Sequence, residues 1–218
     1  MKSFIALTAC TVMEIPAIYS VLKNGEIKAA PVTIEGADIF FVSEPVPPAY
    51  AADELGDRAP LLVADVKGLS KKELDDRLLM NMKFPGSDIW FLTYIRDIED
   101  VFDCFMGNVA KMLIPYHTTR NDVVMEEAYE VTENCIPVLF VSRGKVVCRG
   151  GQTKDIGQAV GELERIGFGE IIVFDTDSML SADDWISLRS RSAGVIPFIR
   201  AVGAAAGDAG FEKIIFDF

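Results

Sequence analysis

Side chains that could act in acid–base chemistry lie at the ends of apolar segments of this 218-residue sequence. Asp65 ends the apolar segment 60–65, and Asp175 ends the segment 169–175. His117, the single histidine, follows the segment 111–115. Carboxylates and histidine are the side chains that most often transfer protons near neutral pH. The sequence therefore indicates Asp65, His117 and Asp175 as candidate catalytic residues.

Further polar residues near the ends of apolar segments could hold a ligand, because they supply hydrogen-bond donors and acceptors. The candidates for ligand binding are Thr8, Arg96, Thr118, Arg149, Asp177 and Arg200. Structural roles compete with the functional ones. His117 could be a solvated loop residue, and Asp175 could cap the turn that follows it.

The two arginines also have structural alternatives. Arg96 could pair with Glu99 or Asp100 on the helix that follows it. Arg200 is expected to pair with Asp175 or Asp217, because a buried charge without a partner is costly.

Eight apolar segments, most of them separated by helix-like segments, position these residues. They are 4–10, 60–65, 88–93, 111–115, 136–141, 169–175, 195–199 and 213–217. Continuously apolar segments are typical of parallel strands that are buried on both faces. Repeated right-handed βαβ connections close such strands into a barrel. We therefore predict one α/β domain over residues 1–218, a (βα)8 barrel in which the last helix is missing or reduced.

An open, doubly wound sheet is the alternative architecture. It is disfavoured because no glycine-rich phosphate loop follows an early strand. A hairpin around Asn24–Gly25 and a short strand over 39–42 are expected between the first two barrel strands.

Local patterns predict where the helices begin and which face they bury. Ser70 and Glu73 have the spacing of a capping box. Asn121 and Ser181 are expected to cap two later helices. The helix after the third strand is expected to bury one face, which consists of Ile98, Val101, Phe102 and Phe105.

Composition excludes several classes of function. The net charge of −12 repels nucleic acid and anionic membranes. The first residues lack the pattern of a signal peptide, and no apolar run reaches the roughly 18 residues of a spanning helix, so a cytoplasmic protein is expected. Cysteines 10, 104, 135 and 148 lack metal-site spacing and are interpreted as reduced thiols. No metal and no cofactor is expected.

Two segments, "RGKVVCRGG" (143–151) and "LERIGFGEIIVFDTD" (163–177), make the sequence resemble one family of barrel enzymes. It resembles the histidine-biosynthesis isomerase family (HisA, with its sister cyclase HisF), and most of all the HisA-related proteins of methanogens. "SEPVPPAYAADELGDRAPLLVADVKGL" (43–69) and "YIRDIEDV" (94–101) add to the resemblance. The resemblance implies a barrel of the ribulose-phosphate-binding kind.

The positions that carry the family's reaction are changed in this chain. The resemblance places the family's two catalytic aspartates at Thr8 and Val141, neither of which is a useful acid or base. It places the family's phosphate-binding glycines at positions occupied here by Leu92, Thr93, Tyr94, Pro115, Val202 and Asp217, with Gly203 retained. These changes imply that phosphoribosyl isomerase activity has been lost.

Three functions remain open. The first is a binding or regulatory barrel in small-molecule metabolism of the archaeal type. The second is an enzyme of isomerase or lyase type that acts on a different small metabolite. The third is a role in assembly, for which a homodimer is expected. Apolar surface for that dimer is expected around Trp90, Trp185, Phe211, Phe216 and Phe218.

Overall fold

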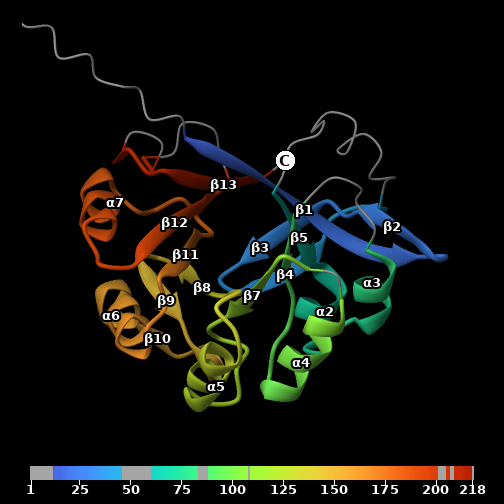
Figure 1. Ribbon diagram of the computed structural model, residues 1–218. Coiled ribbons are helices and arrows are strands. Elements are labelled where there is room, and N and C mark those ends of the chain that lie inside the picture. Colours follow the sequence, from blue (N-terminus) through green and yellow to red (C-terminus); the bar gives the residue numbers. More distant parts are fainter. Residues whose placement is uncertain are drawn as a thin grey trace, which may run out of the picture.

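The computed structural model describes residues 12–45, 60–82, 88–107, 109–200, 205–206 and 209–217. Its parallel strands form a closed barrel, because each pairs with the next and the first pairs with the last. Figure 1 shows this ring of strands with the helices outside it. The barrel strands are β1 (Met13–Lys23), β5 (Leu61–Asp65), β6 (Ile89–Leu92), β7 (Lys111–Pro115), β8 (Cys135–Ser142), β11 (Glu170–Asp175), β12 (Gly194–Ile199) and β13 (Lys213–Asp217). The predicted (βα)8 barrel is thereby confirmed.

The first barrel strand differs from the prediction. The segment 4–10, which was expected to form it, lies outside the described residues, and β1 takes this place instead. β1 pairs in parallel with β13 through Met13 and Lys213 and with β5 through Ser20 and Asp65. Its far end pairs with β2 (Glu26–Ala29) in the expected hairpin. Because β1 is 11 residues long, one strand serves both the barrel and the hairpin.

A second hairpin and a short ribbon lie between barrel strands. β3 (Val32–Glu35) and β4 (Asp38–Phe41) form the hairpin, which follows β2 in the chain. β9 (Lys145–Val147) and β10 (Thr153–Lys154) form the ribbon, which continues from β8.

The helices cover the outside of the barrel. They are α2 (Val66–Lys71), α3 (Asp76–Asn81), α4 (Ile98–Met106), α5 (Val123–Val131), α6 (Ile156–Ile166) and α7 (Ala182–Arg189). The expected cap of α7 is confirmed, because Ser181 forms a capping box with Asp184. The N-cap of α5 is Asp122 and not the expected Asn121, although Asn121 Oδ1 accepts a hydrogen bond from the Val124 N–H in the first turn.

Two further predictions about the helices are wrong. Ser70 caps no helix, because it lies inside α2, which begins directly after β5 and is capped by Asp65. On α4 the buried residues are Val101 and Cys104, whereas Phe102 and Phe105 are exposed. Residues three apart share one side of a helix, so Val101 and Cys104 face the sheet together.

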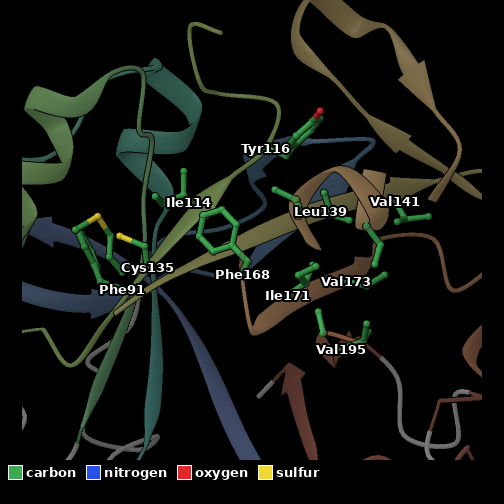
Figure 2. Close-up of a cluster of buried hydrophobic side chains, with 14 of the residues drawn as sticks. Phe91, Ile114, Tyr116, Cys135, Leu139, Val141, Phe168, Ile171, Val173 and Val195 are labelled. Carbon is green, nitrogen blue, oxygen red and sulfur yellow. The ribbon is translucent and has the colours of Figure 1, made fainter. Parts of the chain in front are cut away.

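Apolar side chains form an inner and an outer core. The inner core fills the barrel and includes Ile15, Leu62 and Phe174. The outer core lies between the strands and the helices, and Figure 2 shows part of it, with Phe91 and Leu139 among its members. Neighbouring residues of each strand alternate between the two cores, because successive side chains of a strand point to opposite faces.

Most of the residues that were expected to offer apolar surface to a second subunit are buried in the core of this chain. Trp90 and Trp185 are buried, and so is Phe211, whose ring lies edge-on to Trp185 at 5.8 Å. Phe216 is half-buried, and Phe218 lies outside the described residues. No helix in the described ranges is long and apolar enough to span a bilayer.

Candidate functional site

Aromatic side chains fill the barrel near the C-terminal ends of its strands, which is where barrel enzymes carry their active sites. Phe140, Phe174 and Phe198 lie side by side in the registers of β8, β11 and β12. The rings of Phe174 and Phe198 stack at 3.9 Å, and Phe140 meets Phe174 edge-on at 5.2 Å. All three side chains are completely buried. The part of this barrel end that the structure describes is therefore packed core.

The β3–β4 hairpin lies across the same end of the barrel. Ile34 and Ile39 face each other across the hairpin and are buried in the inner core. In Figure 1 the hairpin crosses the middle of the ring of strands, and β4 packs against α2. On the opposite face of the hairpin, Phe40 is 47% exposed. The hairpin thus acts as a plug whose inner face is apolar.

His117 lies against this aromatic layer. Its ring is 4.8 Å from the ring of Phe140 in an edge-on contact. Its Nδ1 atom is buried and has no hydrogen-bond partner among the described residues. Burial lowers the pKa of His117 to about 4, and the positive charge of Lys72 acts in the same direction. The imidazole is therefore neutral at physiological pH and is a weak base.

Asp65 points away from the barrel interior. Leu61 and Val63, which share its face of β5, belong to the outer core. Its carboxylate accepts hydrogen bonds from the Gly68 N–H at 2.8 Å, the Asp75 N–H at 3.2 Å and Thr93 Oγ1 at 2.8 Å. Burial raises its pKa to about 6 despite these bonds. The carboxylate organises the loop after β5.

Asp175 has a similar position on β11. Ile171 and Val173 on its face of the strand belong to the outer core. Its carboxylate accepts from the N–H groups of Met179 at 3.2 Å and Leu180 at 2.9 Å. Burial raises the pKa of Asp175, and these backbone donors oppose the shift. Asp175 thus holds the turn that follows β11.

Asp177 joins two neighbouring strand ends. It accepts hydrogen bonds from Ser142 Oγ at 3.2 Å and from the Arg143 N–H at 2.7 Å. Thr118 links the loops after β6 and β7, because its hydroxyl, in the loop after β7, is 2.7 Å from the carbonyl oxygen of Ile95 in the loop after β6. Both residues tie loops together at the C-terminal side of the barrel.

The remaining candidates do not converge on one place. Arg96 is exposed, and its Nε is 3.1 Å from a carboxylate oxygen of Asp97, not of the expected Glu99 or Asp100. The Asp100 carboxylate instead accepts from the backbone N–H of Arg96 at 2.7 Å. Arg200 is half-buried directly after β12. Thr8 lies outside the described residues.

A cavity of about 350 Å³ lies beside the β9–β10 ribbon, outside the barrel axis. Arg149 lines it and is exposed, and its Nη1 donates a 3.1 Å hydrogen bond to the Thr119 carbonyl. The described residues provide no carboxylate partner for Arg149. Gly150, at φ +70°, also lines the cavity, and a side chain there would meet nothing. The cavity therefore presents a cation that has no carboxylate partner among the described residues, and it also contains the carboxylate of Asp122.

Lys154 completes the wall of this cavity as part of a cluster that the sequence analysis missed. Its Nζ donates to Tyr116 Oη at 2.8 Å and forms an ion pair with Glu162. Partial burial opposes the charge, but hydrogen bonds to Glu162 and Tyr116 raise the pKa of Lys154. Figure 2 shows the hydroxyl of Tyr116 at the edge of the outer core. These residues come from three separate elements, so no local pattern could have identified them.

Metal or thiol chemistry has little support in the described part of the chain. No group of three or more histidine, cysteine, aspartate or glutamate side chains there is arranged to hold a metal ion. Cys104, Cys135 and Cys148 are free thiols, and burial raises the pKa of Cys135 to about 12. A thiol with a raised pKa is a poor nucleophile.

No protein-family model matches the sequence. No curated protein matches it at a significant level either.

Proposed function

We propose that this protein is a divergent HisA-like barrel that no longer isomerises a phosphoribosyl substrate and has a binding or regulatory role in small-molecule metabolism. The observation that carries the proposal is the packed C-terminal end of the barrel. Phe140, Phe174 and Phe198 occupy the interior there, and the β3–β4 hairpin lies over them. A substrate with two phosphate groups would have to displace both.

The placement of the acids supports the same proposal. Asp65 and Asp175 point outward, and their carboxylate oxygens accept hydrogen bonds from backbone and hydroxyl donors. Val141, to which the resemblance assigns the family's second aspartate, belongs to the outer core. An acid at this position would face the helices and not a substrate. These placements also argue against an enzyme of another type built on Asp65, Asp175 or His117.

The binding site that we assign to this function is the cavity beside Arg149. The guanidinium of Arg149, which has no carboxylate partner among the described residues, and the open backbone at Gly150 are suited to a small anionic metabolite that stays clear of the Asp122 carboxylate on the same wall. The volume of about 350 Å³ lies within the range of cavities that hold small ligands.

Two experiments test the proposal. The gene should fail to restore growth without histidine in a strain that lacks the isomerase, and restored growth would refute the loss of activity. A thermal-shift screen of anionic metabolites should find compounds that raise the melting temperature of the wild-type protein by mass action. The same compounds should have no effect on Arg149→Ala and an unchanged effect on Arg143→Ala, the matched control. Equal shifts in wild type and Arg149→Ala would place the site elsewhere.

A further inference from the structure

Two side chains of opposite charge line the cavity beside Arg149, where the β9–β10 ribbon meets the loop between β7 and α5 (Figure 1). The positive charge is the guanidinium of Arg149, and the negative charge is the carboxylate of Asp122. Arg149 Nη1 donates its hydrogen bond to the carbonyl of Thr119, which precedes Asp122 in the same loop. The two charges therefore come from elements that are bound to each other, and this bond limits their separation.

Neither charge is neutralised within the part of the chain that the structure describes. Arg149 and Asp122 form no ion pair there, either with each other or with a third residue. Asp122 lies at the start of α5, but its side chain accepts no capping hydrogen bond from that helix. Both residues are exposed. The cavity thus presents one cation and one anion to the same small volume.

The other charge on the wall of the cavity is already balanced. Lys154 forms an ion pair with Glu162, and its Nζ also donates to Tyr116 Oη at 2.8 Å. The remaining side chains of the wall are uncharged, and they are Tyr116, Thr119, Cys148, Gln152 and Thr153. Burial raises the pKa of the Cys148 thiol, so this group is neutral at physiological pH. A ligand therefore has two charges to match, those of Arg149 and Asp122.

These two charges favour a ligand that carries both signs. A simple anion at Arg149 is repelled by Asp122, and a simple cation at Asp122 is repelled by Arg149. Within one small cavity both repulsions act inside the Debye length of about 8 Å at physiological ionic strength. A molecule with an anionic group at one end and a cationic group at the other is attracted by both residues.

From this pair of charges, we infer that the cavity binds a small α-amino acid, with its carboxylate against Arg149 and its ammonium group against Asp122. The inference rests on the proposed function, because it names the class of ligand for the same site. The guanidinium has five N–H donors, so the bond to Thr119 leaves others for a carboxylate. The ammonium group is a compact cation with three donors. A volume of about 350 Å³ suits a small ligand.

Three matched probes separate the two charges of the ligand. They are alanine, propionate, which lacks the ammonium group, and ethylamine, which lacks the carboxylate. NMR titration of the whole protein measures their dissociation constants. Alanine should bind about threefold to tenfold more tightly than either analogue, because alanine alone matches both residues. Glycine with acetate, and serine with 3-hydroxypropionate, repeat the comparison for two other side chains.

Asp122→Asn is the decisive variant, because it should change the two affinities in opposite directions. Binding of alanine should weaken by about threefold to fivefold, since an attraction is lost, and binding of propionate should tighten, since a repulsion is lost. Asparagine is as good an N-cap as aspartate, so the start of α5 is preserved. Asp183→Asn removes the same charge at an exposed site on α7, outside the cavity, and should leave both dissociation constants within about twofold of wild type.

Arg149→Ala separates a failure of this inference from a failure of the proposed function. It should weaken binding of alanine and of propionate by about tenfold or more. If propionate binds through Arg149 as tightly as alanine, or if Asp122→Asn leaves the binding of alanine unchanged, the inference is overturned and the anion site of the proposed function stands. If Arg149→Ala changes the binding of no probe, the inference and the proposed site are both wrong.

Discussion

Thr93 Oγ1 donates a 2.8 Å hydrogen bond to the buried carboxylate of Asp65 and so joins the loop after β6 to the end of β5. The same carboxylate accepts from the backbone of Gly68 and Asp75. A residue that the sequence indicates as catalytic is therefore a structural centre for two neighbouring strand ends. The charge is tolerated inside the protein because its oxygens accept three hydrogen bonds.

Removing this carboxylate should destabilise the protein strongly. Asp65→Ala leaves three buried donors without an acceptor, and we expect the free energy of unfolding to fall by about 3–5 kcal/mol. Thr93→Val removes one of the three bonds and should cost about 1–2 kcal/mol. Urea unfolding measures both. The exposed Asp103→Ala on α4 is the control and should stay within about 0.5 kcal/mol; a loss for Asp65→Ala no larger than this would contradict the structural role.

The stability of the protein should depend on pH through two opposed groups. The pKa of His117 is lowered from 6.5 to about 4, so the unfolded chain binds a proton before the folded protein does as the pH falls. The free energy of unfolding therefore decreases by about 3 kcal/mol between pH 6.5 and about pH 4. The pKa of Asp65 is raised to about 6 from 3.8, so the folded protein binds a proton first. This increases the free energy of unfolding by about 3 kcal/mol as the pH falls from 6 to 3.8.

His117→Gln separates these two effects. The variant keeps the contribution of Asp65 and loses that of His117, so it should gain about 3 kcal/mol relative to wild type between about pH 7 and pH 4. Unfolding curves of both proteins at a series of pH values measure the difference. A difference that does not change with pH would mean that the imidazole is not buried in the folded protein.

Neighbouring residues of β4 should respond differently to truncation. Ile39 is 2% exposed and packs into the barrel, so Ile39→Ala should cost about 2–4 kcal/mol by leaving a cavity. Phe40 points to solvent, so Phe40→Ala should cost less than about 1 kcal/mol although it removes a larger side chain. Thermal unfolding compares the two variants. The reverse order would mean that the hairpin does not plug the barrel in this register.

Two lysines of the β9–β10 ribbon allow a similar comparison. Lys154 and Glu162 are largely covered, with side chains 22% and 26% exposed, whereas Lys145 and Asp155 are 53% and 64% exposed. Lys154→Met should therefore cost about 1–3 kcal/mol, and Lys145→Met less than about 0.5 kcal/mol. The pKa of the Tyr116 phenol should also rise in Lys154→Met, because a cationic donor is lost. Ultraviolet titration measures this pKa, and an unchanged value would argue against the hydrogen bond.

The class of the fold and the order of most barrel strands follow from patterns in the amino-acid sequence. Continuously apolar runs of strand length, such as 60–65 and 169–175, can be buried only between two layers, and repeated βαβ order closes them into a ring. The cap at Ser181 was also predictable, because a cap depends on residues within one helical turn.

The direction in which each strand-end residue faces could be read only from the folded protein. The four residues before Asp65 and the four before Asp175 are all apolar, so no alternation marks the inner and outer faces, and a shift of one residue exchanges them. The first barrel strand could not be assigned either, because 4–10 and 13–23 are both apolar, and pairing with Lys213 and Asp65 selects the second. The cluster of Tyr116, Lys154 and Glu162 depends on contacts between residues far apart in the chain, and the closing of the barrel is what brings them together.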